Sequence, residues 1–219
     1  MTTLWTYWNE EPVPEFVQKC IKSWGHETKL ITDKTISQYV DVNTPLNTSP
    51  QRRSDLLRLE VLYKYGGLWL DATTVCYTNF DWVFNQNKCI VFSIPDRGTD
   101  PPVIESWFIY AKKGDPFIKK WRDEFRKMEN YDSINDYISK NNVNISGIDY
   151  PEYLAVYVAA RAAYIPGCVS LLNASTGPYK YHTLGGVESL RNEKPICFVK
   201  FRSVDRADIT PELEQIIFT

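Results

Sequence analysis

Two acidic residues and one arginine between positions 49 and 75 have the types and spacing needed to bind a charged ligand. Asp55 and Arg58 are one helical turn apart, and apolar residues flank them in a segment with helical periodicity. Asp71 directly follows the apolar run 68–70, which predicts a short strand. Open α/β sheets bind ligands beyond the carboxyl ends of their strands, where a carboxylate suits a divalent cation that holds a phosphate. The three residues therefore predict a site for a phosphate-bearing ligand.

A structural explanation fits the pair of Asp55 and Arg58 equally well. Charged side chains among apolar neighbours are costly to bury unless partners or a ligand satisfy them. A buried ion pair between helix and sheet would satisfy both without any ligand, and the helix alone does not separate the two interpretations. The position of Asp71 at the end of the next strand favours the ligand-binding interpretation.

A helix and a strand must position these residues. Ser49 suits an N-cap and Pro50 the first helical position, and Gly66–Gly67 can end the helix. Apolar runs predict strands over 4–8, 28–32, 89–93, 104–111, 169–173 and 196–201, the last closing the sheet, and Asp33 predicts a short helix through Val40. Strands alternating with helices indicate a parallel α/β sheet.

The segments 54–58 (SDLLR) and 62–73 (LYKYGGLWLDAT) resemble glycosyltransferases with a DxD-type motif, above all the capsular polysaccharide synthesis group. Chlorella-virus glycosyltransferase domains are similar in the same way. The resemblance implies the nucleotide-diphospho-sugar transferase (GT-A) fold, an α/β fold with a mostly parallel central sheet and flanking helices. It also implies transfer of a sugar from a nucleotide diphosphate sugar, most often of UDP, with Mn²⁺ or Mg²⁺ as cofactor.

One position departs from the motif, because Thr73 stands where the second aspartate is expected. A neutral hydroxyl is a weaker metal ligand than a carboxylate, so the full ligand set is open. The resemblance implies a C-terminal loop that closes over the donor, and here that loop would bring His182 to the metal bound by Asp71 and Thr73, and Lys180 to phosphate. A lone histidine in a loop is more often an ordinary surface residue.

The first predicted strand ends in an aromatic run that could hold a base. The resemblance places the nucleotide near this strand, which favours Thr6, Tyr7 and Trp8 as donor contacts, and donor contacts are also expected at Arg53 and Ala72. Alternation sends Trp5 and Tyr7 to one face of the strand, where both rings could equally be part of the core.

The resemblance implies an acidic residue near the acceptor, and Asp149 or Glu152 could supply it. A carboxylate there could act as general base on the incoming hydroxyl. Asp149 also stands where the N-cap of the following helix is expected, and this role alone explains it equally well.

Composition excludes several other classes of protein. The net charge of −2 leaves no basic stripe for nucleic acid. A chain of 219 residues is long enough for one α/β domain, residues 1–219. The end of the last predicted helix at Thr219 is consistent with a domain that belongs to a longer polypeptide. Five widely spaced cysteines without a CxxC pair favour reduced thiols and a cytoplasmic location. No apolar run is long enough for a membrane span.

The motif residues and the resemblance together predict a glycosyltransferase that moves a hexosyl or deoxyhexosyl group to a hydroxyl of a glycan. The donor, UDP-glucose or a related UDP-sugar, is what the resemblance implies. Asp71 would hold the metal, Asp55 and Arg58 would orient the donor, and Asp149 would be the base. One alternative is a nucleotidyltransferase, which would need a glycine-rich basic loop after the first strand that the sequence lacks. The other is a non-catalytic sugar-binding domain in which the same charges are structural.

Overall fold

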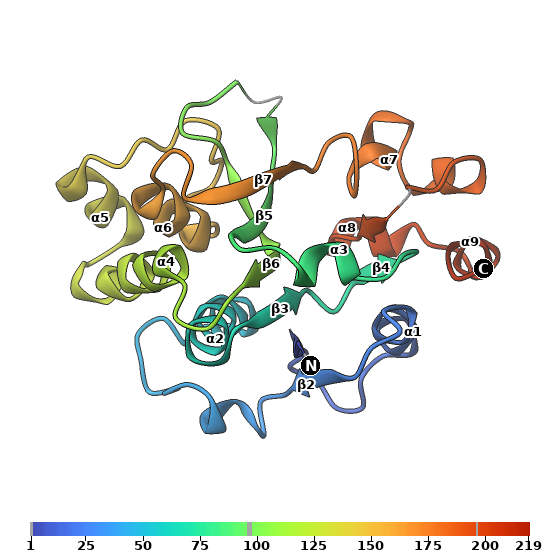
Figure 1. Cartoon of the computed structure of the whole chain (residues 1–219), viewed down its shortest axis with the longest axis horizontal. Coiled ribbons are helices and arrows are strands. Elements are labelled where there is room, and N and C mark those ends of the chain that lie inside the picture. The colour runs from blue at the N-terminus through green and yellow to red at the C-terminus, as the bar shows by residue number, and fades with distance from the viewer. Residues whose placement is uncertain (1, 96–97, 196) are drawn as a thin grey trace.

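The structure is a computed structural model, and it describes residues 2–95, 98–195 and 197–219. In this part of the chain the main sheet has six strands in the order β2-β1-β3-β6-β5-β7 (Figure 1). Their bounds are β2 Thr28–Ile31, β1 Leu4–Tyr7, β3 Gly67–Leu70, β6 Ile104–Ala111, β5 Cys89–Ser93 and β7 Val169–Asn173. Only β6 runs antiparallel to its neighbours among these strands. The predicted α/β class with a mostly parallel sheet is confirmed.

Helix α2 (Pro50–Tyr65) leads directly into the central strand β3. The Ser49 hydroxyl accepts a hydrogen bond from the Arg52 amide at 3.2 Å, as an N-cap should. Gly66 has a φ of 70°, which favours glycine and ends the helix. The sequence therefore predicted both ends of this helix correctly, and these ends fix where Asp71 emerges from the sheet.

One face of the sheet packs against α2, α4 (Pro116–Lys127) and α6 (Ala155–Ala163), with α5 (Ile134–Asn141) outside them (Figure 1). The largest apolar cluster fills this interface and contains Trp5 and Trp69 from the strands. The Trp121 indole of α4 donates to the carbonyl of Val156 in α6 at 2.7 Å, which joins two of the helices.

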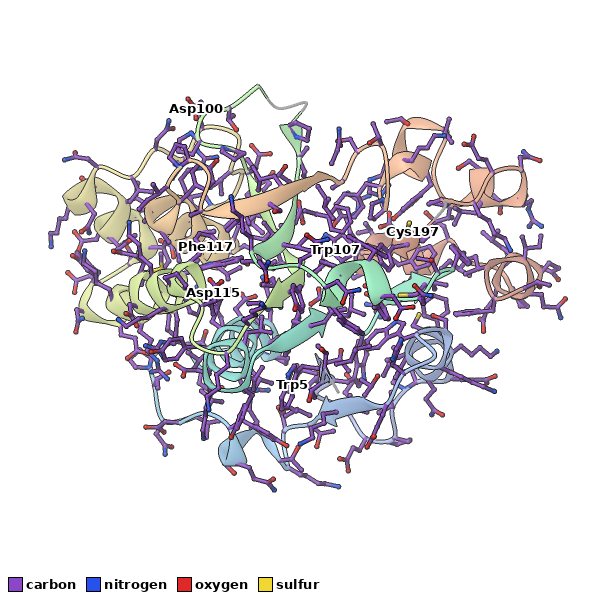
Figure 2. All side chains as sticks on the ribbon, in the orientation of Figure 1. Trp5, Asp100, Trp107, Asp115, Phe117 and Cys197 are labelled. Atoms are coloured by element: carbon purple, nitrogen blue, oxygen red, sulfur yellow. The ribbon has the colours of Figure 1, made fainter. Side chains whose placement is uncertain are left out.

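The opposite face carries a second layer built around a small antiparallel sheet. This sheet pairs β4 (Thr74–Cys76) with β8 (Phe198–Lys200), and its helices are α1 (Glu15–Ser23), α3 (Asp81–Phe84), α7 (Lys180–Thr183), α8 (Ser203–Ala207) and α9 (Pro211–Ile217). Trp107, labelled near the middle of Figure 2, belongs to the aromatic cluster between the two layers, and its ring stacks on Phe92 with centroids 4.9 Å apart. This packing holds the second layer firmly against the main sheet.

Two predicted elements differ from the structure. The segment Asp33–Val40 forms only the 3-10 turn η1 (Ile36–Gln38) instead of a helix capped by Asp33. The late strand β8 pairs with β4 and so does not close the main sheet, while Ile196 lies outside the described residues. Among the described residues, no helix combines the length and the apolar content needed to cross a bilayer.

Candidate active site

A cavity of about 980 Å³ opens where β1 and β3 end and where the chain leaves β8. It lies beside the first half of α2 and the start of β6, so segments far apart in sequence contribute to it. The charged and hydroxyl-bearing residues that line it include Ser54, Asp55, Arg58, Asp71, Thr73, Glu105, Ser106, Lys200, Arg202 and Arg206. The three residues singled out in the sequence, Asp55, Arg58 and Asp71, therefore share one cavity.

Asp71 is a half-buried carboxylate surrounded by donors. Its Oδ1 accepts from the Trp69 indole at 3.0 Å and lies 3.4 Å from Arg58 Nη2. Its Oδ2 lies 3.0 Å from Lys200 Nζ. Burial alone would raise the pKa of Asp71, but Lys200, Arg58 and the indole outweigh it and lower the pKa to about 2. Asp71 is therefore anionic at any physiological pH.

Arg58 ties α2 to the beginning of β6. Its Nη1 donates to both the carbonyl and the hydroxyl of Ser106 at 2.7 Å, and its Nη2 donates to the Ser54 hydroxyl at 2.9 Å. The same Nη2 lies 3.2 Å from Asp55 Oδ1. The buried ion pair of the structural explanation is therefore present, and Arg58 also borders the cavity.

Asp55 has one oxygen that the described residues leave without a partner. The residue is only 2% exposed, its Oδ1 pairs with Arg58, and its Oδ2 is buried with no hydrogen bond. Burial raises the pKa of Asp55 to about 6, against the opposing effect of Arg58. A buried oxygen of this kind is costly unless a ligand donates to it.

Two of the three residues expected to bind metal, Asp71 and Thr73, contact an ammonium group instead. Lys200 Nζ lies between Asp71 Oδ2 and Thr73 Oγ1, at 3.0 and 2.9 Å. His182 lines the same cavity, but its Nε2 faces Asp205 at 3.6 Å and its ring stacks on Tyr179. Burial lowers the pKa of His182. Within the described residues, no three His, Cys, Asp or Glu side chains are grouped to hold a metal, so this set does not fit a divalent ion as it stands.

The aromatic residues at the end of β1 divide between cavity and core. Tyr7 and Trp8 line the cavity, whereas Thr6 is fully buried. The Tyr7 hydroxyl donates to Asp33, and burial together with this bond raises the pKa of Tyr7 to about 12. Arg53 pairs with the same Asp33 at 2.9 Å and is not among the described residues that line the cavity. Tyr7 and Trp5 face the same apolar cluster, as alternation predicted.

The structure does not place two other expected residues in the cavity lining. Lys180 pairs with Glu193. Asp149 is exposed, and helix α6 begins at Ala155 with Leu154 as N-cap, so the expected capping role of Asp149 is wrong. The alternative base, Glu152, is also exposed and accepts from the Asn135 amide at 3.1 Å. Ala72, by contrast, lines the cavity as expected.

Sequence reasoning missed four charged residues of the cavity lining, Glu105, Lys200, Arg202 and Arg206, of which the first two are buried. Glu105 is buried on β6 and accepts hydrogen bonds from the hydroxyls of Tyr157 at 2.6 Å and Tyr179 at 3.3 Å. Lys200 is the last residue of β8. Glu105 and Lys200 are each the one charged residue in a largely apolar strand segment, IESWFIYA and FVKF. A charged residue in such a segment is unusual, and this feature could have identified both as candidates from the sequence.

The mouth of the cavity is aromatic. Tyr150 and Tyr153 are 81% and 63% exposed and both line it. On the wall, the Arg206 guanidinium lies 5.6 Å from the centroid of the Trp8 ring. Exposed rings of this kind are suitable surfaces for a sugar or a base.

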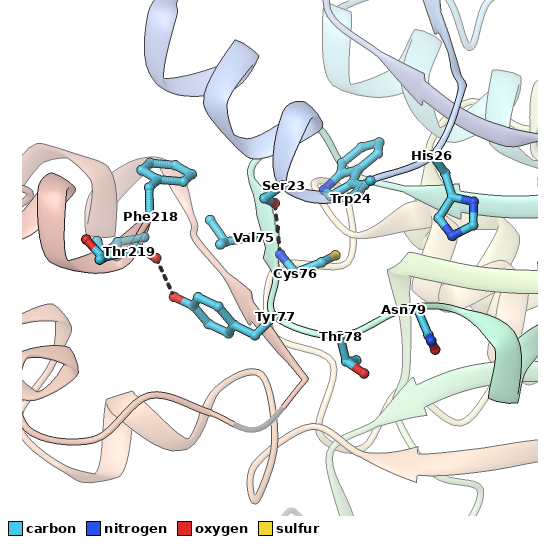
Figure 3. A pocket seen from close by; sticks show the side chains of 12 residues that line it. Ser23, Trp24, His26, Val75, Cys76, Tyr77, Thr78, Asn79, Phe218 and Thr219 are labelled. Carbon is cyan, nitrogen blue, oxygen red and sulfur yellow. Dashed lines mark hydrogen bonds between the residues drawn. The ribbon is translucent and has the colours of Figure 1, made fainter.

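A second cavity, of about 540 Å³, lies between the end of α1, β4 and the C-terminal residues (Figure 3). Two hydrogen bonds cross its walls, from the Cys76 amide to the Ser23 hydroxyl at 3.0 Å and from the Tyr77 hydroxyl to the carbonyl of Ile217 at 3.0 Å. Among the described residues that line it there is no Asp, Glu, Lys or Arg. It therefore lacks the charged side chains that distinguish the first cavity.

The chain belongs to the family of capsular polysaccharide synthesis proteins, whose model matches residues 1–151. The match includes Asp55, Arg58, Asp71 and Thr73 and ends before Lys200.

Two curated fungal proteins are similar to part of the chain. One is the O-glycosyltransferase braB of Annulohypoxylon truncatum, 29% identical in an alignment of 157 residues, with 57% of this chain and 37% of braB covered. The other is the glycosyltransferase afumC of Aspergillus fumigatus, 27% identical in an alignment of 142 residues, with 55% of this chain and 36% of afumC covered. The similarity spans little more than a third of the length of either relative.

Two solved structures align with nearly the whole chain. PaToxG glycosyltransferase is 15% identical with a TM-score of 0.45, and the alignment covers 99% of this chain and 86% of that one. A glycosyltransferase involved in glycosylation of the major capsid of PBCV-1 is 11% identical with a TM-score of 0.47, and 99% and 98% of the two chains are covered.

Proposed function

We propose that this domain is a glycosyltransferase that moves a hexosyl or deoxyhexosyl group from a UDP-sugar to a hydroxyl of a glycan. Membership of the capsular polysaccharide synthesis family and the glycosyltransferase names of both curated relatives support the reaction class. The observation that carries the donor site is the buried Oδ2 of Asp55, which has no partner among the described residues and belongs to a residue that lines the cavity beside Arg58. A sugar hydroxyl would supply the missing donor.

The cavity offers separate places for the parts of a nucleotide sugar. Tyr7 and Trp8 are available to the base, as expected from their position at the end of β1. Arg202 and Arg206, which follow β8, bring two guanidinium groups to the wall, where they suit a diphosphate. Asp55 would then accept hydrogen bonds from the sugar hydroxyls. In this arrangement the anomeric carbon would lie deep in the cavity.

The acceptor would enter past the aromatic mouth. Tyr150 and Tyr153 present exposed rings there, and sugars pack well on such surfaces. A general base for the acceptor hydroxyl has to reach the cavity, and Glu105 does so from β6. We therefore assign this role to Glu105 ahead of Asp149.

The test is product analysis after incubation with a panel of UDP-sugars and glycan acceptors, read by NMR. We expect a new glycosidic linkage and release of UDP with at least one UDP-hexose or UDP-deoxyhexose. Pyrophosphate released from UTP and a sugar phosphate would instead indicate a nucleotidyltransferase. Binding of free glycan without any binding of UDP or UDP-sugars would indicate a non-catalytic sugar-binding domain.

A further inference from the structure

An ammonium group occupies the place where the DxD-like motif would hold a metal. Lys200 Nζ lies 3.0 Å from Asp71 Oδ2 and 2.9 Å from Thr73 Oγ1, the two positions that flank Ala72 in the motif. Lys200 is only 8% exposed and lines the cavity. Its charge is therefore a fixed part of the site and not a mobile surface group.

Backbone pairing and a neighbouring side-chain hydrogen bond fix the position of Lys200. In the small sheet, Lys200 is the register partner of Thr74. Next to it, the Phe201 amide donates to the carbonyl of Thr73 at 3.1 Å, and the Thr73 hydroxyl donates to the carbonyl of Phe201 at 2.8 Å. Because the Thr73 hydroxyl donates its hydrogen bond to the Phe201 carbonyl, its lone pairs can accept a hydrogen bond from Lys200.

The surrounding charges favour one ammonium over an additional divalent ion. Both oxygens of Asp71 already have partners, Oδ1 with Trp69 and Arg58 and Oδ2 with Lys200. A divalent cation on Asp71 would lie beside two fixed positive charges and would have to displace Lys200 from its two acceptors. Thr73 would offer it only a neutral oxygen already engaged in two hydrogen bonds.

We propose that Lys200 takes the place of the divalent metal and neutralises the diphosphate of the donor, so that donor binding and transfer do not require Mn²⁺ or Mg²⁺. This inference rests on the proposed donor site. An ammonium has three N–H donors, and the described residues accept two of them, which leaves one for a phosphate oxygen. Asp71 and Thr73 are then positioning residues that hold Lys200.

In the transfer, the bond between the anomeric carbon and the phosphate oxygen breaks, and its electron pair stays on UDP. The acceptor oxygen bonds to the anomeric carbon, and the acceptor proton passes to the carboxylate base. Lys200 stabilises the negative charge that develops on the departing UDP. The step needs no reactant other than donor and acceptor.

The first test is calorimetric titration of UDP into the wild-type protein in EDTA and again with Mn²⁺. We expect UDP to bind in EDTA, with a dissociation constant that Mn²⁺ changes by less than about threefold, which is under 1 kcal/mol. UDP binding that appears only with Mn²⁺ would overturn the role of Lys200 and leave the proposed function standing. No UDP binding in either buffer would overturn the proposed function itself. This comparison needs no variant, so it remains decisive if a variant fails to fold.

The second test compares Lys200→Gln with Lys140→Gln, an exposed lysine of α5 that pairs with Asp136 away from the cavity. Loss of a hydrogen bond from a charged group should weaken UDP binding in EDTA about tenfold or more in Lys200→Gln. Uridine, which has no phosphate, should bind both variants and the wild type equally, and Lys200→Arg should recover part of the UDP affinity. Equal UDP affinity of Lys200→Gln and the wild type would overturn the proposal.

The third test is the converse substitution, Lys200→Asp, which places a second carboxylate next to Asp71. This pair offers oxygen ligands to a cation, so UDP binding should become dependent on Mn²⁺. If Lys200→Asp binds UDP in EDTA as tightly as the wild type does, the ammonium has no part in binding the diphosphate.

Discussion

At the scale of single residues, Asp55 and Asp71 have opposite pKa shifts although both contact Arg58. Burial dominates at Asp55 and raises its pKa to about 6. At Asp71 burial acts in the same direction, but Lys200 and Arg58 outweigh it and lower the pKa to about 2. Asp71 is therefore an anion at physiological pH that pairs with Lys200, while Asp55 has a pKa of about 6 and one oxygen without a partner among the described residues.

The first prediction concerns the pH dependence of turnover. Because the pKa of Asp55 is raised to about 6, its protonated fraction grows as the pH falls through that value, and a protonated carboxyl accepts hydrogen bonds less well. We expect kcat/KM for the donor to fall below about pH 6 in the wild type. Asp55→Asn should have low activity without this acid limb, as measured by pH profiles of both proteins. If kcat/KM of Asp55→Asn falls below about pH 6 in the same way as that of the wild type, a group other than Asp55 causes the fall.

The second prediction separates the two candidates for the base. Glu105→Gln keeps the shape of the side chain and removes the carboxylate, so kcat should fall by about a hundredfold or more if Glu105 accepts the acceptor proton. Asp149→Asn, at an exposed position outside the cavity lining, serves as the matched control and should keep nearly full activity. A large loss of kcat in Asp149→Asn with full activity in Glu105→Gln would reverse the assignment.

At the scale of elements, Arg58 joins α2 to β6 and at the same time borders the cavity. Arg58→Lys keeps the charge but cannot reproduce the planar fork that reaches Ser106 and Ser54 together. We expect a loss of about 1–3 kcal/mol in the free energy of unfolding, as for broken buried hydrogen bonds, together with weaker UDP-sugar binding. Denaturant titration and calorimetry measure the two effects.

Arg126→Lys is the matched control for this substitution. Arg126 also links α4 to α2, through a contact of 2.6 Å with Glu60, but it is half-buried and outside the cavity lining. Its replacement should change stability by less than about 1 kcal/mol and leave donor binding unchanged. If both variants behave alike, Arg58 has no special role in the site.

The junction of α2 and β3 supplies another prediction. A Cβ on Gly67 would lie 2.3 Å from the Thr3 carbonyl oxygen and 2.8 Å from Trp5 Nε1, so Gly67→Ala must push β1 away from β3. Gly114→Ala is also at a positive φ, 76° against 115° at Gly67, but has open space around its Cβ and should cost only about 1–2 kcal/mol. Gly67→Ala should cost more than this and raise KM for the donor, because β1 ends at Tyr7 and leads directly into Trp8. Equal unfolding midpoints of the two variants would contradict this packing argument.

The elements also show what sequence could and could not predict. Local signals, such as the Ser49 cap and Gly66, fixed the ends of α2, and the apolar runs identified β5 and β6. The pairing of β8 with β4 is a contact across more than a hundred residues, which periodicity does not encode. Lys200 was missed for this reason, because its role depends on the partner strand that brings it to Asp71. Asp149 was misjudged because the N-cap of the helix is Leu154, five residues later than expected.

At the scale of the whole molecule, the site forms where the two layers meet. The main sheet contributes the ends of β1 and β3 and the start of β6, and the second layer contributes β8 and the arginines that follow it. The family match ends at residue 151, so the segment that supplies Lys200, Arg202 and Arg206 lies beyond it. The proposed donor site therefore combines carboxylates and Arg58 from inside the matched segment with cations from beyond it.

The most direct test of the donor site is thermal unfolding with UDP and with a panel of UDP-hexoses, measured on the wild type and on Asp55→Asn. A ligand at a hundred times its dissociation constant stabilises a protein by about 2.7 kcal/mol, which is readily detected. We predict that at least one UDP-hexose stabilises the wild type more than UDP does, and that Asp55→Asn loses this advantage of the sugar while it retains the shift with UDP. Two results would contradict the assignment of this cavity as the donor site. One is that no UDP-sugar stabilises the wild type; the other is that the UDP-hexose stabilises Asp55→Asn beyond UDP as much as it stabilises the wild type.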